Sequence, residues 1–534
     1  MQRRTILTGT ALGVAGAAFG LSPSARASTS PSARASASLS AWASARGPIA
    51  IRGVTVIDAA GGVRRGCTVL LRGDRIVDAG PAQRVPIPHD ATVLDGAGKY
   101  LIPGLADMHT HAVGIDDTDP ELYVVNGVTT TRQMSGSAQA RAWQQQIAAG
   151  ARLGPRWSIG SRIVDGAPSL WDGLDVDGSV HVSVANPAEA RSAVRREHAA
   201  GAAFIKTYTR LSRDSFLAIA DECGKLGLPF LGHVPDFVAL TEAADRGMRT
   251  VEHLFEIWFD TSSQEERLRR AVAAVPIGPG DYNGWFTKMH PYEYAAARSY
   301  DRRKAARVFD RIARHGTFVT PTLVLHETND MPERIRRHDP RYRYFSPDVI
   351  DYWDWALDNL YLPGRTPARI AESRELFRRR LALTAGLADA GVPLMTGTDL
   401  GTTYLMPGFS VHDELALFVR AGLKPIEALA AATLNPARYL GRPDQGVIRR
   451  GAVADLVLLD ADPLHDIRNS TRIDSVFVGG VHLGPARRRR MLADIEAAAS
   501  RPKPAAAAPV AFRGCPCHGG SRSQLSAAAE PTAA

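Results

Sequence analysis

The side chains best suited to bind a metal ion, directly or after modification, lie in the central part of the sequence, each in or at the end of a short apolar run. They are His109, His111, Lys206, His233, His253 and Asp399. His109 and His111 are two residues apart, so in a β-strand both rings point to the same side and can reach one metal ion. This spacing predicts a metal site built at the end of a strand.

Taken one at a time, these residues have ordinary explanations. A His-x-His pair is more often exposed on a strand surface, and a strand-terminal aspartate is often a cap or turn residue. Lys206 follows the apolar run 202–205, where an unpaired ammonium group is costly to bury, and such a lysine usually pairs with a carboxylate or extends to solvent. Together, however, the six groups fall at the carboxyl ends of five predicted strands, which favours one shared site.

The elements that must position these residues are strands alternating with helices. From 101 to 440, short β-rich runs alternate with helical stretches rich in Ala, Leu and Arg, which is typical of a parallel sheet. The eight candidate strands are Leu105–His109, Val128–Gln133, Arg156–Ile163, Phe204–Tyr208, Phe230–Val234, Thr250–Leu254, Thr317–Leu325 and Val392–Thr398. Eight strand–helix units predict an α/β fold, a (β/α)₈ TIM-type barrel over 103–440 with its site at the carboxyl ends of the strands.

Two long segments, near 255–316 and 326–385, interrupt this pattern and are rich in Arg, Tyr and Trp. Insertions after barrel strands lie on the carboxyl-terminal face, so we expect them to form a lid over the site. The flanks 49–102 and 441–486 alternate in the manner of strands. Because each has little apolar surface of its own, we expect them to form one composite β-sandwich into which the barrel is inserted.

The sequence resembles the amidohydrolase superfamily over about 49–483. The resemblance is carried by His109-x-His111, Phe204-Ile205-Lys206, Gly232-His233-Val234-Pro235, Val251-Glu252-His253, Thr396-Gly397-Thr398-Asp399 and Ala432-Thr433-Leu434-Asn435-Pro436-Ala437. The imidazolonepropionase-like and prolidase-like members are the most similar branch. The resemblance implies a metal-dependent hydrolase that acts on an amide-type C–N bond.

It also implies a role for each site residue. The ligands fall into two groups with a bridge: His109, His111 and Asp399 for one divalent metal ion, His233 and His253 for a second, and a carboxylated Lys206 between them. Imidazole and carboxylate ligands suit Zn²⁺, with Mn²⁺, Fe²⁺ or Co²⁺ as alternatives. The two ions would share a hydroxide and polarise the substrate carbonyl, while Asp399 would carry a proton to the leaving amine.

Several neighbouring residues have more than one interpretation. Tyr208, two residues after Lys206 on the same strand face, is a candidate catalytic residue that stabilises an oxyanion or holds a substrate carboxylate, or else a structural tyrosine. Arg210 either binds an anionic substrate or is an exposed residue at a helix start. His181, in the predicted loop after the third strand, is either a substrate contact or solvated. His412 and Glu414, at the start of the helix after the last strand, are expected to act as caps or to support the site residues rather than in catalysis.

The basic charge lies at the two ends of the chain. The protein has 534 residues, 45% of them hydrophobic, and a formal net charge of +9. The segments 1–47 and 487–534 each carry a net charge of +5, which leaves −1 for 48–486. The body therefore offers no compositional case for nucleic-acid binding. Four cysteines in so long a chain exclude a small disulfide scaffold.

The segment 1–27 is typical of a twin-arginine-like signal peptide, because Arg3 and Arg4 precede a short apolar stretch and an Ala25-Arg26-Ala27 site. We therefore expect export by the twin-arginine (Tat) translocation machinery to the periplasm, cell envelope or medium, without stable membrane insertion. The segments 28–48 and 487–534 are expected to be a disordered linker and tail. The tail holds Cys515-Pro516-Cys517-His518, which resembles half of a Rieske ligand set, but no Cys-x-His box accompanies it.

These features leave more than one function open. The leading hypothesis is an exported metal-dependent amidohydrolase whose substrate is a small molecule such as a dipeptide, an N-acyl amino acid or a cyclic amide. The same centre can also serve a lactonase, an esterase or a phosphotriesterase, and a non-catalytic binding protein is a further alternative. The presence of every expected ligand favours catalysis. A homo-oligomer is compatible with the sequence.

Overall fold

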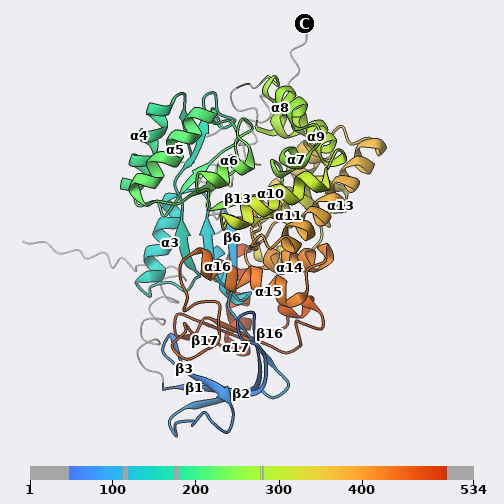
Figure 1. Ribbon diagram of the computed structural model, residues 1–534. Coiled ribbons are helices and arrows are strands. Elements are labelled where there is room, and N and C mark those ends of the chain that lie inside the picture. The colour runs from blue at the N-terminus through green and yellow to red at the C-terminus, as the bar shows by residue number, and fades with distance from the viewer. Residues whose placement is uncertain (1–46, 112–117, 174–179, 277, 279–281, 502–534) are drawn as a thin grey trace, which may run out of the picture.

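The structure is a computed structural model that describes residues 47–111, 118–173, 180–276, 278 and 282–501. The predicted signal peptide, all but the last two residues of the predicted linker, and the Cys515-Pro516-Cys517-His518 motif lie outside the described residues. In Figure 1 the chain forms a larger α/β part above and a smaller β-sheet part below, the latter built around β1, β2 and β3.

Short parallel strands occupy the centre of the larger part. One sheet has the order β6 (Leu105–Thr110), β7 (Val128–Gln133) and β8 (Arg156–Ile159). The other has the order β10 (His181–Val184), β9 (Ile163–Gly166), β11 (Ile205–Thr207), β12 (Phe230–Gly232), β13 (Thr250–Glu252) and β14 (Phe318–Thr320). The backbone N–H of Ala203 donates to the Ile159 carbonyl at 2.9 Å and so connects the two sheets. The predicted strand 156–163 is in fact two strands, β8 and β9.

The predicted eighth strand, Val392–Thr398, forms no regular ladder. Leu394 makes an isolated parallel bridge with Val319, and Leu400 makes another with Thr110. Gly397 lies so close to its neighbours that a Cβ atom added to it would be 2.7 Å from the His109 Cβ, closer than such atoms approach in proteins. The prediction of one closed eight-stranded barrel is therefore corrected: the described strands form two parallel sheets, and 392–400 links their edges through single contacts.

The predicted strand 317–325 is also shorter than expected. β14 ends at Thr320, and helix α11 (Leu323–Asp330) begins three residues later. The backbone N–H groups of Leu323 and Val324 donate to the Glu414 carboxylate at 2.9 and 2.8 Å. Glu414 therefore acts as a cap, as predicted, but it caps α11 rather than its own helix, and a contact across some 90 positions leaves no local trace in the sequence.

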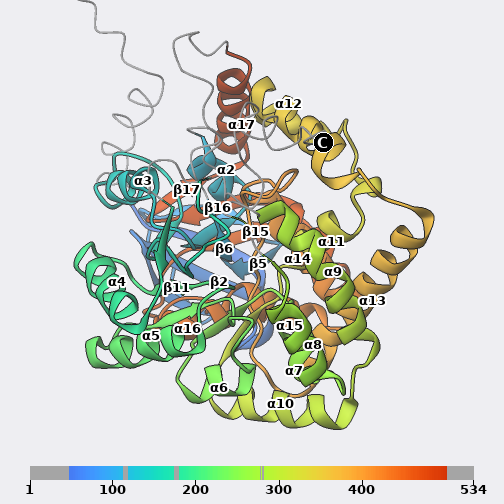
Figure 2. The ribbon, with the colours of Figure 1, turned by 90° about the horizontal axis from the view of Figure 1, so that it is seen from above.

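Helices surround these strands on the outside. They are α2 (Asp119–Val125), α3 (Ala138–Ala148), α4 (Pro187–Ala199), α5 (Arg213–Leu226), α6 (Leu240–Asp245), α14 (Phe409–Ala421), α15 (Pro425–Ala432) and α16 (Leu434–Tyr439). α5 follows Ser212, whose side chain accepts the Ser215 N–H, and it ends at Gly227 with φ 62°. Seen from above in Figure 2, α4 and α5 lie on one side of the strands and α11 and α13 on the other.

The two insertions are largely helical. The first contains α7 (Ile257–Thr261), α8 (Glu265–Ala273), α9 (Tyr282–Arg298) and α10 (Arg302–Arg314); the second contains α12 (Pro347–Ala356), the π-helical turn η3 (Leu357–Tyr361) and α13 (Pro367–Asp389). Arg380 of α13 donates to Glu293 of α9 at 2.6 Å and to Asp330 of α11 at 2.9 Å. This buried guanidinium ties the two insertions together beside the cavity.

Both flanks contribute to one eight-stranded sheet. Its order is β17 (Val481–Leu483), β16 (Ile473–Val478), β15 (Leu456–Leu459), β5 (Tyr100–Pro103), β1 (Ile49–Asp58), β2 (Gly62–Arg72) and β3 (Arg75–Pro81), with β4 (Thr92–Asp95) also paired to β1. The antiparallel pairing of β15 with β5 joins the C-terminal strands to the N-terminal ones. Leu101, Val56 and Leu456 are fully buried in its core. A two-sheet sandwich with the predicted boundaries stays a prediction.

The predicted disordered tail begins later than expected. Helix α17 (Pro485–Ala499) occupies its first part, and Ile495 packs in a cluster with Trp353 of the second insertion. Arg488 donates to the Val125 carbonyl at 3.0 Å. The prediction of disorder from 487 is therefore wrong over 487–499, because Met491, Ile495 and Ala499 recur every fourth residue and form one apolar stripe that the four arginines obscure in the composition.

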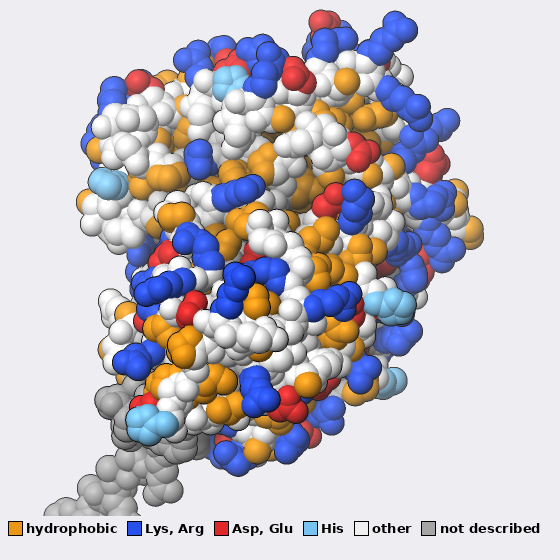
Figure 3. All heavy atoms as spheres, turned by 60° about the horizontal axis from the view of Figure 1, so that its bottom comes forward, with side chains coloured by type: hydrophobic (Ala, Val, Ile, Leu, Met, Phe, Trp, Pro, Cys, Tyr) orange, Lys and Arg blue, Asp and Glu red, His pale blue; other side chains and the backbone are white. Residues whose placement is uncertain are grey.

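The surface shows no concentration of one kind of side chain on the face seen in Figure 3. Lys and Arg side chains are scattered there among hydrophobic and acidic ones. Within the described residues, no helix combines the length and the apolar character needed to span a bilayer.

Candidate metal centre

The six predicted metal-binding residues all line one cavity of about 730 Å³, together with Tyr208. His109 lies in β6 and Lys206 in β11, while His233 and His253 directly follow β12 and β13. His111 directly follows β6, and Asp399 follows the irregular segment 392–398. All six side chains are buried. The parallel strands therefore bring the predicted ligands to one place, although these are spread over almost 300 positions of the chain.

The tightest group contains His109, His253 and Asp399, whose potential ligand atoms all lie within 4.8 Å of one another. The ring centroids of His109 and His253 are 4.6 Å apart, and those of His233 and His253 are 4.9 Å apart. The Nε2 atoms of His109 and His111 each lie 3.2 Å from Asp399 Oδ1. This grouping differs from the predicted assignment of ligands, in which His109 and Asp399 bind one metal ion and His253 binds the other.

Each of the four histidines has its Nδ1 atom within 3.4 Å of a side-chain oxygen outside the centre. The partners are Glu252 for His109 (2.7 Å), Thr322 for His253 (2.7 Å), Thr209 for His233 (2.9 Å) and Ser135 for His111 (3.4 Å). A partner on Nδ1 fixes the ring orientation and leaves Nε2 available as a ligand. The four rings are thus arranged as metal-binding histidines usually are.

The contact between His109 and Asp399 is itself a test of whether a cation fits. Burial would raise the pKa of Glu252, but the Arg132 guanidinium and His109 hold that pKa well below its usual value. An ionised Glu252 only accepts hydrogen bonds, so His109 Nδ1 is the donor and, in the neutral ring, Nε2 carries a lone pair. That lone pair faces Asp399 Oδ1, and neither atom has a hydrogen-bond partner among the described residues. Two buried acceptors in contact are the arrangement that a shared cation stabilises.

The pKa shifts in the centre favour lone pairs and negative charge. Burial lowers the pKa of His111 to about 4 and holds the pKa values of His233 and His253 well below the usual range. Burial opposes ionisation of Asp399, yet His109, His111 and His253 hold its pKa well below normal. Neutral rings at His111, His233 and His253 beside an ionised Asp399 are the protonation states that metal binding requires.

Lys206 is buried beside this group, and burial lowers the pKa of its amine to about 8. Gly232 makes room for the side chain, since a Cβ atom there would lie 2.9 Å from Lys206 Cδ. Gly232 also has a φ of 132°, which other residues rarely adopt. The lysine is therefore held inside the site rather than directed to solvent.

Two of the site residues have an uncommon backbone conformation. His253 and Asp399 have φ values of 65° and 57°, in the left-handed region. Non-glycine residues in this region store strain of roughly 1–3 kcal/mol, and such residues cluster at functional sites. The turn directs each side chain from the end of its strand segment into the cavity.

The other candidates differ in position. The Tyr208 ring lies 4.3 Å from the His233 ring and lines the cavity. Arg210 lines a different hollow, where it pairs with Asp236 at 2.7 Å and packs over Trp285. Its side chain is 11% exposed, so the prediction of an exposed helix-start residue is wrong. His181 lies in strand β10, within 3.2 Å of an Asp172 oxygen, and is not among the described residues lining the main cavity.

Sequence reasoning missed two further groups. The buried Arg132 donates to Glu252 at 2.6 Å, so an ion pair supports the imidazole of His109 from outside the centre. His326, in α11, is fully buried and lines the cavity, with its ring centroid 6.4 Å from that of His253. The sequence did hold a signal for Arg132 and Glu252, because each is a single charged residue inside a predicted strand. Charged residues are rarely buried in such strands unless they are paired.

Comparisons with known proteins agree with this geometry. An uncharacterized protein of Mycobacterium bovis is 37% identical over 122 residues, 23% of this chain and 32% of that protein. An imidazolonepropionase of Pyrobaculum arsenaticum is 40% identical over 74 residues, 14% of this chain and 18% of that enzyme. The chain thus matches about a third or less of the length of these relatives.

Solved structures match over a much larger part of the chain. A bottromycin amidohydrolase has a TM-score of 0.66 and 24% identity, covering 88% of this chain and 94% of that one. A putative prolidase from Bifidobacterium longum has a TM-score of 0.57 and 24% identity, covering 84% and 98%. At these identities the likeness shows the fold, a TIM-barrel type with mixed α/β content.

The amidohydrolase family model matches residues 100–483, which is most of the chain. The resemblance to the imidazolonepropionase-like and prolidase-like branch is confirmed by these matches. The chain belongs to the amidohydrolase family.

Proposed function

We propose that the protein is an exported, metal-dependent amidohydrolase that cleaves an amide-type C–N bond of a small molecule such as a dipeptide, an N-acyl amino acid or a cyclic amide. The observation that carries the proposal is the convergence of four imidazoles and Asp399 in one buried cavity, with each imidazole held from outside through Nδ1. Export by the twin-arginine machinery is part of the proposal and rests on the Arg3-Arg4 segment alone.

The proposed ligands are those of the sequence-based hypothesis. They are His109, His111 and Asp399 for one ion, His233 and His253 for the other, and a carboxylated Lys206 between them. Divalent ions bound there, Zn²⁺ being the best suited, would lower the pKa of water and polarise the scissile carbonyl. A lysine pKa of about 8 leaves part of the amine neutral at neutral pH. The neutral amine adds CO₂, forms the carbamate C–N bond and releases one proton.

Two residues of the chain act directly on the substrate in this proposal. An Asp399 carboxylate oxygen accepts a proton from the attacking water and passes it to the leaving nitrogen, which would otherwise depart as an unstable anion. The Tyr208 hydroxyl donates a hydrogen bond to the carbonyl oxygen as negative charge develops on it. The position of the Tyr208 ring, 4.3 Å from the His233 ring, supports this role.

The test combines metal analysis with a substrate panel. Wild-type protein, purified without chelator and with bicarbonate, is compared with Lys206→Ala and with Lys225→Ala, which alters an exposed lysine. We expect about two metal ions per chain in the wild type and the control, as in other two-metal sites. Metal content and hydrolysis of dipeptides, N-acyl amino acids and cyclic amides should fall together in Lys206→Ala.

Two outcomes would count against the proposal. Folded wild-type protein that retains only trace metal after reconstitution would contradict the metal mechanism. Hydrolysis of lactones, esters or phosphotriesters without any cleavage of amides would replace the amidohydrolase proposal by the alternative activity.

A further inference from the structure

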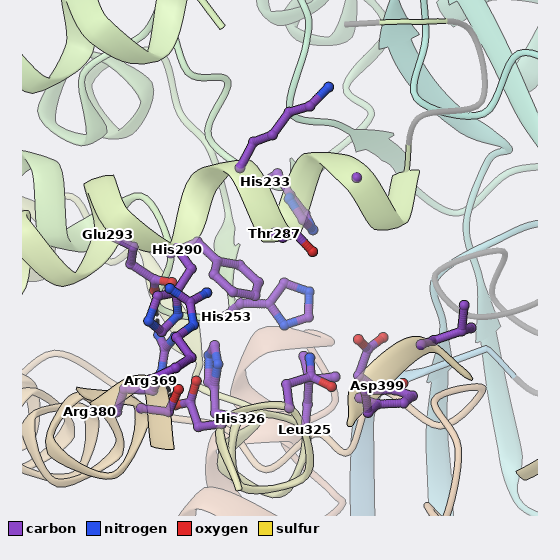
Figure 4. Close-up of a pocket in the computed structure, with 18 of the residues that line it drawn as sticks. His233, His253, Thr287, His290, Glu293, Leu325, His326, Arg369, Arg380 and Asp399 are labelled. Atoms are coloured by element: carbon purple, nitrogen blue, oxygen red, sulfur yellow. Dashed lines mark hydrogen bonds and ion pairs between the residues drawn. The ribbon is translucent and has the colours of Figure 1, made fainter. Parts of the chain in front are cut away.

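The cavity continues from the metal centre to the helices of the two insertions. The Phe255 ring lies 5.4 Å from the His253 ring and 4.9 Å from the His326 ring, and Arg380 Cζ lies 5.5 Å from the same Phe255 ring. Figure 4 shows His290, Glu293, Arg369 and Arg380 gathered at one end of the pocket and Asp399 at the other, with His253 between them. A substrate in this cavity therefore has a second end to place, across an apolar ring from the metal centre.

Within the part of the chain that the structure describes, the charges at this second end leave one guanidinium without an ion-pair partner. Arg380 is paired with both Glu293 and Asp330, and Arg365 is paired with Glu333 at 2.9 Å. Arg369, in α13, lines the cavity but makes no ion pair and no side-chain hydrogen bond with any residue that the structure describes. It is only half-exposed, and both burial and the nearby Arg365 lower its pKa. Glu372, Asp330 and Glu293 act in the opposite direction, so this cation is partly desolvated and only partly compensated, a state that a directly bound anion would improve.

Two imidazoles that line the same cavity, His290 and His326, also have unused hydrogen-bonding atoms. Both ring nitrogens of His326 and the Nε2 atom of His290 are buried and have no partner among the described residues. His326 is fully buried, and both rings line the cavity. A neutral imidazole always carries one N–H donor, so each ring brings one donor to this part of the cavity. Buried polar atoms without partners are rare in native proteins unless a ligand or water supplies the missing bond.

We propose that Arg369, His290 and His326 form a subsite for a carboxylate group of the substrate, at the end of the molecule away from the bond that is cleaved. A guanidinium binds a carboxylate through two parallel N–H···O bonds, and the imidazole N–H groups complete its coordination. Among the guanidinium groups of the described cavity lining, Arg369 alone has no ion pair, and its one positive charge matches one negative charge. A dianionic phosphate would be repelled by the adjacent Glu293 and Asp330. The substrate class is therefore a monoanionic carboxylic acid that carries an amide bond, an assignment that rests on the proposed hydrolytic function.

The test compares substrates that differ only in this charge. N-acetyl-L-proline, N-acetyl-L-leucine, Gly-L-Pro and Gly-L-Leu are each paired with the corresponding C-terminal amide. Three variants are measured beside the metal-loaded wild type: Arg369→Gln, His326→Gln and Arg378→Gln. Arg378 is the matched control, because it lies in the same helix but is exposed and makes no ion pair among the described residues.

We expect wild type and Arg378→Gln to favour the free acids in kcat/KM. Arg369→Gln should lower kcat/KM by about 10- to 100-fold for the acids and by less than about threefold for the amides, since a charged hydrogen-bonded pair is lost only with the acids. His326→Gln should show the same selectivity with a smaller change. Metal content and the thermal unfolding midpoint should remain those of the wild type in both variants.

A binding measurement separates failure of this inference from failure of the proposed function. Calorimetric titration with N-acetyl-L-proline and with its amide is run on the same four proteins. If no substrate is hydrolysed but the acid binds more tightly than the amide and Arg369→Gln removes the difference, the carboxylate subsite stands and the hydrolytic function falls. Equal binding and equal hydrolysis of acids and amides, or equal losses for both in Arg369→Gln, would overturn the subsite.

Discussion

At one end of the cavity Glu252 and Asp399 bring two carboxylates to a group of imidazoles, and at the other end Arg380 brings one guanidinium to two carboxylates. Arg132 holds the pKa of Glu252 low against the effect of burial, whereas burial raises the pKa values of Glu293 and Asp330 despite Arg380. The first end therefore keeps its negative charge for a cation. The second end opposes the ionisation of its carboxylates and retains a spare cation, which suits an anion.

The two ends also differ in which elements build them. The metal end is formed by residues in or directly after strands, with Asp399 after the irregular segment 392–398, whereas the other end is formed by α9, α11 and α13. Strand ends in this fold are rigid and are held by many neighbours, so they suit chemistry that needs fixed geometry. The amino-acid sequence of inserted helices can vary without disturbing that geometry, so such helices are suited to determine which substrate binds.

The largest expected effect is at the metal end. Asp399→Asn should reduce kcat/KM by about 10³-fold or more, because the variant loses both a charged ligand and the proton carrier. Asp389→Asn, an exposed change at the end of α13, serves as the control. Steady-state kinetics and metal content per chain are the measurements. Activity of Asp399→Asn within tenfold of the wild type would exclude this aspartate as the proton carrier.

Glu252→Gln tests the support of the metal end. The change leaves Arg132 buried without its charged partner, so the free energy of unfolding should fall by about 3–5 kcal/mol. Metal affinity should fall by roughly 10- to 100-fold, because Glu252 orients His109. Denaturant unfolding and metal titration measure these effects, with the exposed Glu266→Gln as control. Adding Arg132→Met should restore part of the stability; if the double variant is less stable than Glu252→Gln, the ion-pair explanation fails.

Arg380→Met is the corresponding change at the other end, and we expect a smaller loss of about 2 kcal/mol at pH 7. Breaking a buried ion pair is costly, but Glu293 and Asp330 already have raised pKa values and can take up protons. A carboxyl group whose pKa is higher in the folded state than in the unfolded state makes the protein less stable as the pH rises. The loss should therefore shrink as the pH is lowered from 7 to 5. A loss independent of pH would contradict the difference drawn between the two ends.

The smallest expected effect is the pH dependence that His290 gives to the stability. Burial, and then the charges of Arg369, Arg380 and Arg365, lower the pKa of His290 to about 3. Because this folded-state pKa lies below the unfolded value, the unfolded chain binds the proton first, and His290 lowers the stability as the pH falls below about 6.5. The stability of His290→Gln relative to the wild type should accordingly increase from pH 6.5 to pH 5. Chemical denaturation at these pH values measures it, and parallel curves would show that His290 is not held neutral.

Much of the metal end could be predicted because its residues obey a local rule. His109, His233 and His253 each stand in or directly after a short apolar run that becomes a strand, and parallel strands bring such positions together whatever lies between them. Helix α5 was equally predictable, since its cap at Ser212 and its stop at Gly227 are local signals. The segment 392–398 was not, because its irregular course depends on how closely Gly397 approaches two neighbouring strands.

The sequence by itself determined the types and the order of the proposed ligands, the alternation of strands and helices, and the presence of two insertions. Only the tertiary structure decided that Arg132 supports Glu252, that Glu414 caps α11, and that Arg369 has no ion pair with a described residue in the cavity that His326 also lines. These facts depend on contacts between residues that are far apart in the chain. Periodicity and capping report the local preference of a segment, whereas the pairing of buried charges is settled by packing.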